Sequence, residues 1–368
     1  MKNKKIRLGV LFGGKSAEHE VSLNSAKNII EALDREKYDV FLIGIDKTGE
    51  WRLRDAYSYL MNADNPKLIS LQKSQDNVAL VPQNDRKELV SYSGNQLQEA
   101  LKLDVIFPVL HGTYGEDGTV QGLLKLANIP FVGAGVLGSA IGMDKDVMKR
   151  LLRDAKIPTA RFLTIHNYDK DRFTFEGIVT ELGLPFFVKP ANLGSSVGIA
   201  KVKSKQDFEA AISQAFLYDR KILIEEFING REIECSVLGN DHPIASLPGE
   251  LIPQHEFYSY EAKYIDEEGA HFQIPVELPE EITKKIQEMA IYAYRTLCCE
   301  GMARVDFFLQ ANGDVVLNEI NTIPGFTKIS MYPKLWMASG LSYGDLLDRL
   351  IALAIERHAH EARLKTTF

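Results

Sequence analysis

The 368-residue sequence has little cysteine and no excess of basic charge. Its cysteines are Cys235, Cys298 and Cys299, an odd number without a C-x-x-C pair. We therefore expect reduced thiols rather than a disulfide framework or a zinc site. The formal net charge of -7 argues against non-specific nucleic-acid binding, because that activity needs a basic face.

Long apolar runs, internal repeats and low-complexity linkers are also missing from the sequence. No segment predicts a membrane span, and the basic N-terminal residues lead into a short apolar run that ends in glycines, unlike a signal peptide. We therefore expect a cytoplasmic protein with neither a membrane nor a nucleic acid as partner.

The first part of the chain alternates apolar strands with helical patterns. Strands are predicted over residues 6–12, 38–46 and 104–110, with helices over residues 22–33 and 119–127. Glycine-rich turns follow the first and third strands, and this order predicts a doubly wound parallel α/β unit. Residues 50–100 are polar and weakly patterned, and we expect an irregular segment there.

Two more units are predicted, in line with the two or three domains that the length favours. The second mixes short strands with helices, and the third combines strands with a long amphipathic helix over residues 279–297. The predicted domains cover residues 1–144, 145–228 and 229–368, an α/β domain followed by two α+β domains.

The most informative stretch is the hairpin predicted around Asn312-Gly313, a turn signal between two apolar runs. With a two-residue turn, Asp306 pairs with Glu319 and Arg304 with Asn321, all on one face. Two facing carboxylates are destabilising unless a cation neutralises them. Oxygen ligands without histidine or cysteine suit Mg²⁺ or Mn²⁺ rather than zinc.

The alternative is an exposed hairpin face whose acids point at water. The apolar residues Phe308, Val315 and Leu317 are expected on the same face as Asp306, and they argue against full exposure.

A second candidate site follows the predicted strand that ends at Lys189-Pro190. The loop Gly194-Ser195-Ser196-Val197-Gly198 offers backbone N–H groups and hydroxyls to an anion, and glycine permits close approach. Lys189 and Lys145 are cations suited to phosphate. An ordinary hairpin loop is the alternative. The apolar strand that ends at residues 225–228 could offer backbone groups to a base, and Glu232 could accept a ribose hydroxyl.

The segment from Gly9 to Ser16 fits the phosphate-loop pattern G-x-x-x-x-G-K-[ST]. Gly9 lies inside the predicted strand rather than after it, so we interpret the match as accidental and expect no nucleotide at Lys15. The turn still lies at the carboxyl end of a strand, where open α/β sheets bind ligands. A phosphate-loop NTPase that uses Lys15 and a non-catalytic binding protein remain competing hypotheses.

Taken together, these motifs resemble the D-alanine–D-alanine ligase family of the ATP-grasp superfamily over nearly the whole chain. The motifs that carry the resemblance, in chain order, are Gly13-Gly14-Lys15-Ser16-Ala17-Glu18-His19-Glu20-Val21-Ser22, His111-Gly112 with Gly115-Glu116-Asp117-Gly118, Lys189-Pro190 with the glycine-serine loop, Tyr260-Glu261-Ala262-Lys263-Tyr264, and Arg304-Val305-Asp306 with Asn318-Glu319-Ile320-Asn321-Thr322 and Pro324-Gly325.

The resemblance implies a reaction in which ATP phosphorylates one D-alanine and the amine of a second attacks the acyl phosphate, yielding D-alanyl-D-alanine for peptidoglycan. It also implies a homodimer. The alternative is another ATP-grasp carboxylate–amine ligase with a different amino-acid or hydroxy-acid substrate. Tyr264 resembles the dipeptide-forming members rather than those that make an ester with D-lactate. The insertion at residues 50–100, together with Lys328-Ile329 before Ser330, resembles the longer branch of the family.

The family's site residues carry over to matching positions. Two Mg²⁺ ions (or Mn²⁺) would be held by Asp306, Glu319 and Asn321. The nucleotide would be bound by Lys145, Lys189, Ser195, Ser196, Lys263, Asn318 and Glu319 around its phosphates, by Glu225, Glu226, Phe227 and Ile228 around adenine, and by Glu232 at the ribose.

The resemblance implies substrate and catalytic residues as well. Glu18, beside His111, would pair with the first D-alanine's ammonium group, and Ser330 would bind the second D-alanine's carboxylate. Arg304 and the Gly325 amide would stabilise the oxyanion. Glu18, Ser195 and Tyr264 would form a hydrogen-bonded triad, and residues 257–266 would form a lid.

Overall fold

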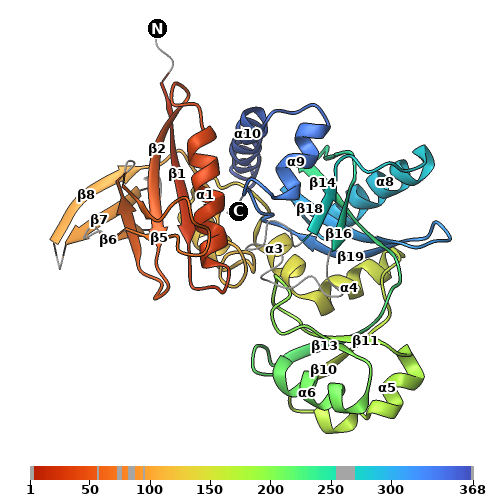
Figure 1. Ribbon diagram of the computed structural model, residues 1–368. Helices are drawn as coiled ribbons and strands as arrows, with labels where there is room; N and C mark the ends of the chain where they lie inside the picture. The colour runs from red at the N-terminus through yellow and green to blue at the C-terminus, as the bar shows by residue number, and fades with distance from the viewer. Residues whose placement is uncertain are drawn as a thin grey trace.

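A computed structural model describes residues 4–55, 58–72, 77–81, 88–93, 96–253 and 270–365. Within these residues the chain forms a seven-stranded, a six-stranded and a four-stranded sheet, with the short pair β4 (Leu60–Met61) and β5 (Ser70–Leu71) apart from them. In Figure 1 the first sheet lies beside the six-stranded sheet, and the four-stranded sheet lies below them. None of the helices in the described segments is long and apolar enough to span a bilayer.

The N-terminal sheet contains the predicted parallel unit. Strand β1 (Ile6–Gly13) lies between β2 (Tyr38–Ile45) and β9 (Val105–Val109), and all three run parallel. Alternate residues of β1 enter two cores, one with helix α1 (His19–Ala32) and the other with α2 (Thr119–Leu126). Both faces are covered, so the doubly wound parallel prediction is confirmed.

The expectation of an irregular segment over residues 50–100 is wrong. Strands β3 (Trp51–Arg54), β6 (Asn77–Val81), β7 (Glu88–Ser93) and β8 (Gln96–Lys102) extend the N-terminal sheet in antiparallel pairs beyond β2. Short strands of this kind depend on a neighbouring edge for their hydrogen bonds more than on their own propensity. The one local signal is alternation in β6, where Val78 and Leu80 are buried.

The four-stranded sheet has the order β10 (Phe162–His166), β13 (Lys221–Glu226), β11 (Phe186–Pro190) and β12 (Ala200–Val202). Its strands pair antiparallel. Residues of α5 (Phe175–Leu182) and α6 (Lys205–Ala215) share one apolar core with the sheet, and a short 3-10 turn (Lys170–Arg172) precedes α5.

The six-stranded sheet carries most of the cleft described below. Its main path runs β17 (Ala270–Gln273), β16 (Gly249–Pro253), β14 (Arg231–Gly239), β18 (Gly301–Leu309) and β19 (Val315–Asn321), and β15 (Ile244–Ala245) pairs with β14. Helix α8 (Glu280–Thr296) covers one face, while α9 (Met331–Ala338) and α10 (Tyr343–Glu361) follow β19.

Packing crosses the predicted domain boundaries. The C-terminal helix α10 contributes Leu346 and Leu350 to the core that also holds Leu8 and Val10 of β1. Helix α4 (Lys145–Asp154), which follows α3 (Val136–Met143), packs its apolar residues into the core of the six-stranded sheet. These cores join residues from both sides of each predicted domain boundary, so the boundaries at residues 144 and 228 stay predictions.

The hairpin between β18 and β19 has the predicted register at its functional end. Arg304 pairs with Asn321, and Asp306 pairs with Glu319. The predicted two-residue turn is wrong, however. Gln310 N–H donates to the carbonyl of Asp314 at 2.9 Å, and Gly313 has φ +84°, typical of a longer loop with glycine in the left-handed region.

A β-bulge compensates for the longer loop, because Phe307 pairs with Leu317 while the preceding Asp306 still pairs with Glu319. The bulge leaves Asn318 as an extra residue and reverses the alternation of side chains along β19. Leu317 therefore packs, with Val315, into the core behind the sheet. The expectation that these two share the face of Asp306 is wrong, whereas Phe308 does line the cleft.

The burial of β1 gives a testable prediction at Gly9, where an added Cβ would lie 3.0 Å from Leu103 and 3.3 Å from Ile43. We expect Gly9→Val to lower the free energy of unfolding by about 1–3 kcal/mol through overpacking, measured by urea denaturation. Gly122→Ala is the control, because nothing lies within 4 Å of its added Cβ on α2. It should be neutral or stabilising, and equal unfolding curves for Gly9→Val and wild type would contradict the buried position of β1.

Candidate active site

The cleft consists of two adjoining pockets between the sheets. The first is lined by residues of the N-terminal sheet's loops, of the six-stranded sheet and of the segment before α9; the second lies against the four-stranded sheet. Both pockets are bordered by Gly194, Ser195, Glu232, Phe308, Asn318 and Glu319.

Every predicted site residue in the described part of the chain lines one of these pockets. The first contains Glu18, His111, Ser195, Glu232, Arg304, Asp306, Asn318, Glu319, Asn321, Gly325 and Ser330, and the second adds Lys145, Lys189, Ser196, Glu225, Glu226, Phe227 and Ile228. Lys263 and Tyr264, with the predicted lid, lie outside the described residues.

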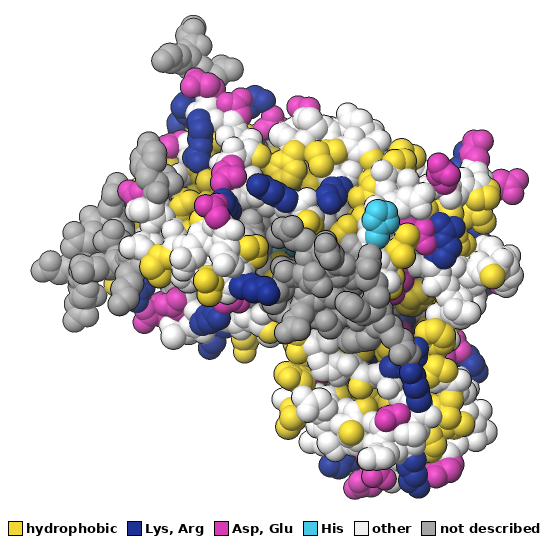
Figure 2. Space-filling model, viewed as in Figure 1, with side chains coloured by type: hydrophobic (Ala, Val, Ile, Leu, Met, Phe, Trp, Pro, Cys, Tyr) yellow, Lys and Arg dark blue, Asp and Glu magenta, His cyan; other side chains and the backbone are white. Residues whose placement is uncertain are grey.

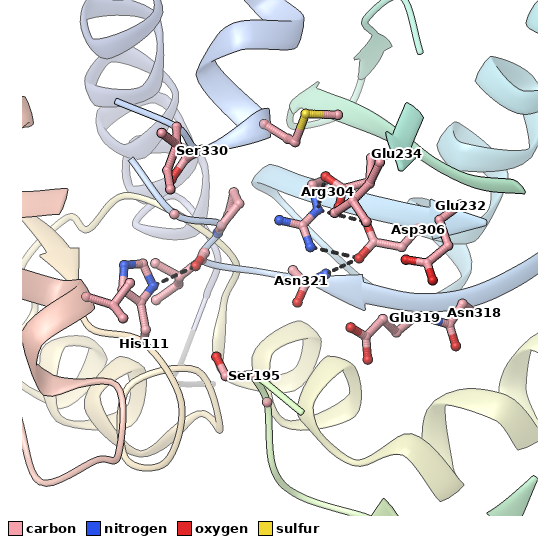
Figure 3. A pocket seen from close by; sticks show the side chains of 18 of the residues that line it. His111, Ser195, Glu232, Glu234, Arg304, Asp306, Asn318, Glu319, Asn321 and Ser330 are labelled. Atoms are coloured by element: carbon pink, nitrogen blue, oxygen red, sulfur yellow. Dashed lines mark hydrogen bonds and ion pairs between the residues drawn. The ribbon is translucent and has the colours of Figure 1, made fainter. Parts of the chain in front are cut away.

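Arg304 lies between carboxylates from two strands (Figure 3). Its Nε and Nη2 donate to the two oxygens of Asp306 at 2.7 and 2.8 Å, and its Nε also lies 2.9 Å from Glu234 Oε2. Asn321 Nδ2 donates to Asp306 at 3.0 Å. Glu234 is a site residue that the sequence analysis missed. It pairs with Asp306 across β14 and β18, and the alternation of Glu232 and Glu234 along one strand was the available signal.

Glu319 has a basic neighbour on the opposite side of the cleft. Lys145 Nζ lies 3.4 Å from Glu319 Oε2 and donates to the carbonyl of Leu193 at 2.8 Å. Lys145 begins helix α4, whose first turn is capped by the Asp144 side chain. The N-cap thereby fixes where the lysine leaves the helix.

Lys189 is paired with Glu225, and Glu225 is paired in turn with a second lysine. Lys189 Nζ lies 2.6 Å from Glu225 Oε1, while Lys149 Nζ lies 2.7 Å from Oε2. Although burial raises it, the two lysines hold the pKa of Glu225 below its usual range. The sequence analysis missed Lys149, although its position four residues after Lys145 places both on one helical face.

The N-terminal sheet contributes the turn at Glu18 and the loop at Gly112. The Ser195 hydroxyl donates a hydrogen bond to the Glu18 carboxylate, which connects the glycine-serine loop to the N-terminal sheet. Gly112 has φ +74°, and an added Cβ would lie 2.4 Å from Glu18 Oε2. A side chain at residue 112 would therefore displace the carboxylate.

His111 and Glu116 bind the two backbone polar groups of one residue, Ile323. His111 Nδ1 donates to the carbonyl of Ile323 at 3.0 Å, and its Nε2 accepts from Ser25 at 3.0 Å. Glu116 accepts the N–H of Ile323 at 3.1 Å and that of Gly112 at 2.7 Å. These contacts attach the segment before Gly325 to the N-terminal sheet.

His111 is buried and Glu116 is partly buried, and the pKa values of both are shifted. Burial lowers the pKa of His111 to about 4, so the ring is neutral. Burial, together with the carboxylate of Glu18, raises the pKa of Glu116 to about 8. Both ring nitrogens of His111 form hydrogen bonds within the protein, to Ile323 and Ser25. The predicted contact of His111 with substrate stays a prediction. Glu116 belongs to a quoted motif, but the sequence analysis gave it no role.

Ser330 lies beside Gly325 at the start of α9. Its Oγ accepts from the N–H of Thr327 at 2.9 Å, and an added Cβ on Gly325 would lie 2.7 Å from that Oγ. Any side chain at Gly325 would therefore crowd the hydroxyl that faces the cleft.

Lys15 lines neither pocket. Its side chain extends over Gly49 and its Nζ lies 6.0 Å from the centre of the Tyr114 ring. Gly9 pairs within β1 with strands on both sides, so this backbone cannot wrap around a phosphate. The phosphate-loop hypothesis therefore loses its structural basis, and the interpretation of the match as accidental is confirmed.

The donor chemistry at the hairpin fits a hard divalent cation. Across the described segments, no three His, Cys, Asp or Glu side chains form a metal-binding group. The predicted set differs in type, because it combines the facing carboxylates of Asp306 and Glu319 with the amide of Asn321. Such oxygen ligands are those that Mg²⁺ accepts.

A parallel α/β unit, followed by two sheets that enclose a cleft between them, defines the ATP-grasp class of ligases. The solved structures that match the chain are of this class. Two family models cover most of the sequence: "D-ala D-ala ligase N-terminus" matches residues 7–134, and "D-ala D-ala ligase C-terminus" matches residues 151–352. The chain belongs to the D-alanine–D-alanine ligase family.

Individual relatives agree with this assignment. The D-alanine–D-alanine ligase of Shouchella clausii is 58% identical over 363 residues, covering 99% of this chain and 98% of the relative. D-alanine–D-alanine ligase A of Escherichia coli K12 is 54% identical, with 99% of each chain covered.

Two solved structures match almost the whole fold. The D-alanine–D-alanine ligase of Coxiella burnetii has a TM-score of 0.82 at 41% identity, covering 98% of this chain and 96% of its own. The VanG D-Ala:D-Ser ligase of Enterococcus faecalis has a TM-score of 0.83 at 37% identity, covering 95% and 100%.

The buried, neutral His111 predicts a pH dependence of stability. Its pKa is about 4 when folded, against 6.5 for the free side chain, so the unfolded chain takes up the proton first as the pH falls. We expect wild type to lose on the order of 3 kcal/mol of unfolding free energy between pH 6.5 and 4 through this residue. Urea denaturation of wild type and His111→Gln across that range checks it, because the variant lacks this loss. Parallel stability curves would contradict the burial of a neutral imidazole.

Proposed function

We propose that this protein ligates two D-alanine molecules to D-alanyl-D-alanine at the expense of ATP, supplying peptidoglycan synthesis in the cytoplasm. The observation that supports it is the meeting of the two pockets at Gly194-Ser195 and Asn318-Glu319. A nucleotide in the second pocket would direct its terminal phosphate into the first. The names of the relatives support D-alanine as the substrate.

The second pocket would hold ATP. Adenine would contact the backbone of residues 225–228, since the Glu225 carboxylate is already shared between two lysines. Glu232 would accept the ribose hydroxyls. The phosphates would be bound by Lys145, Lys189, Ser195, Ser196, Lys263 and Asn318.

Asp306, Glu319 and Asn321 would hold two Mg²⁺ ions, or Mn²⁺. The paired carboxylates and the amide supply oxygen ligands, and the like charges across the hairpin favour a cation. When bound, the metal would neutralise charge on the phosphate oxygens. Arg304 neutralises part of the carboxylate charge of Asp306 through two hydrogen bonds.

The first pocket would hold the two amino acids. Glu18 would pair with the ammonium group of the first D-alanine, near His111, and Ser330 would bind the carboxylate of the second. Arg304 and the N–H of Gly325 would stabilise the negative oxygen of the tetrahedral intermediate. Ser195 and Tyr264 would join Glu18 in the triad that closes the pocket.

The chemistry has two steps. An oxygen of the first D-alanine's carboxylate takes the γ-phosphoryl group, and ADP leaves. The nitrogen of the second D-alanine then attacks the acyl carbon and loses a proton, and the bond between that carbon and the phosphate oxygen breaks. Phosphoryl transfer needs positioning and charge neutralisation more than covalent participation by the protein. The residues around the cleft are of the types that supply both.

A homodimer is part of the proposal, on the strength of the family alone. A ligase for another amino acid or hydroxy acid is the alternative, and its discriminating test is the second substrate. The VanG structure is that of a D-Ala:D-Ser ligase, so D-serine and D-lactate should be compared with D-alanine as acceptors.

The first test incubates the protein with ATP, Mg²⁺ and D-alanine, and follows phosphate release and dipeptide formation. We expect both products to depend on D-alanine and Glu319→Gln to lower the rate at least about a hundredfold, because it removes transition-state electrostatics. Lys15→Ala is the control and should keep the wild-type rate. The ligase function would be refuted if phosphate release did not depend on D-alanine, continued in Glu319→Gln and was lost in Lys15→Ala.

The second test concerns the acceptor subsite. Ser330→Ala should raise the KM for the second D-alanine roughly tenfold, the cost of one hydrogen bond to a charged group, at unchanged ADP affinity. Ser339→Ala, at the other end of α9, is the matched control, since its hydroxyl donates to Leu335. Initial rates over a range of D-alanine concentrations at saturating ATP measure the effect. An unchanged KM in Ser330→Ala, with the control also normal, would remove Ser330 from the subsite.

A further inference from the structure

One buried lysine near the second pocket does not face it. Lys149 on α4 is 1% exposed and lines neither pocket, whereas Lys189 and Glu225 both line the second. The Glu225 carboxylate lies between the two ammonium groups, with Oε2 at 2.7 Å from Lys149 and Oε1 at 2.6 Å from Lys189. The three side chains form a buried trio of two cations and one anion.

Lys149 is a rigidly held charge. Its Nζ also donates to Thr159 Oγ1 at 3.0 Å. The neighbouring Met148 and Leu152 of α4 are fully buried in the core of the six-stranded sheet. This packing fixes the helix backbone at Lys149, and the burial of the side chain and its bond to Thr159 hold the ammonium group beside Glu225.

The sharing of Glu225 determines how much of the positive charge of Lys189 stays unneutralised and can attract a ligand. Without Lys149, Glu225 and Lys189 would form a neutral pair. With Lys149 present, one carboxylate serves two ammonium groups, and the trio keeps a net positive charge. Charges in the protein interior interact far more strongly than in water, so this excess is felt at the pocket surface where Lys189 ends.

We propose that Lys149 is a positioning residue for phosphate binding: by sharing Glu225, it keeps Lys189 in place and incompletely neutralised for the phosphates of a nucleoside di- or triphosphate. The inference rests on the proposed nucleotide pocket. It assigns Glu225 a side-chain role besides any backbone contact with the base. Lys149 touches no ligand and acts only through its two partners.

The test compares Mg·ADP with adenosine, because the two probes share the base and ribose and differ in the phosphates. Isothermal titration calorimetry on the full chain should show that Lys149→Met weakens Mg·ADP binding roughly tenfold, about 1.4 kcal/mol, at unchanged adenosine affinity. In kinetics the KM for ATP should rise with little change in kcat. Lys149→Arg, which keeps the charge, should restore most of the loss.

A second variant isolates charge from packing. In Lys149→Met/Glu225→Gln the carboxylate that would neutralise Lys189 is also removed, so the ratio of Mg·ADP to adenosine affinity should return toward wild type. Arg357→Met is the matched control, because Arg357 is a buried cation whose partners are the carbonyls of Phe131 and Gly133 and the Glu300 carboxylate, away from both pockets. It should lose thermal stability without changing that ratio.

The outcomes separate this inference from the proposed function. A wild-type protein that binds no Mg·ADP refutes the nucleotide pocket itself. If wild type binds Mg·ADP, equal affinity in Lys149→Met, or a parallel loss of adenosine binding, overturns the role of Lys149. Should Lys149→Met fail to fold, Lys149→Gln, which keeps a polar contact but no charge, carries the same expectations and the same refutation.

Discussion

The organisation of the cleft depends on one electrostatic constraint: three carboxylates from adjacent strands face the same space. Glu234, Asp306 and Glu319 lie side by side on β14, β18 and β19, and such an arrangement is stable only if positive charge is supplied. Arg304 supplies it from within the sheet and Lys145 from the opposite side of the cleft. The β-bulge also shapes this cluster of charges, since it places Asn318 and Glu319 together at the pocket wall.

The cleft is assembled from parts of the chain that are far apart in sequence. His111 binds the carbonyl and Glu116 the N–H of Ile323, and Ser195 reaches Glu18 across the pocket. Figure 2 shows Lys and Arg side chains on this face of the molecule, on the side of the N-terminal sheet as well as on that of the four-stranded sheet. Apolar packing of α10 against the N-terminal sheet holds the N-terminal and C-terminal parts of the cleft in fixed relative positions. The site is thus a contact between sheets, and its geometry depends on how they pack.

Local patterns in the sequence were sufficient to predict much of the fold and of the site. The parallel unit followed from apolar strands ending in glycines, and the facing of Asp306 and Glu319 followed from one turn signal. The second success arose from two compensating features: the loop is longer than predicted, and the bulge restores the pairing. Residues 50–100 were misjudged because their strands obtain hydrogen bonds from β2, a partner that the local pattern does not reveal.

The sequence by itself determined which chemistry is present, because residue type decides charge, hydrogen-bonding capacity and backbone freedom. The ordered motifs around Glu18, His111, Lys189 and Asp306 identified the family without any coordinates. Only the tertiary structure decided how those groups are paired. Three arrangements join separate elements. Glu225 is shared by Lys149 and Lys189, the backbone of Ile323 is bound by His111 and Glu116, and Glu234 lies beside Arg304. Such pairings depend on packing and burial across sheets, which a linear pattern does not contain.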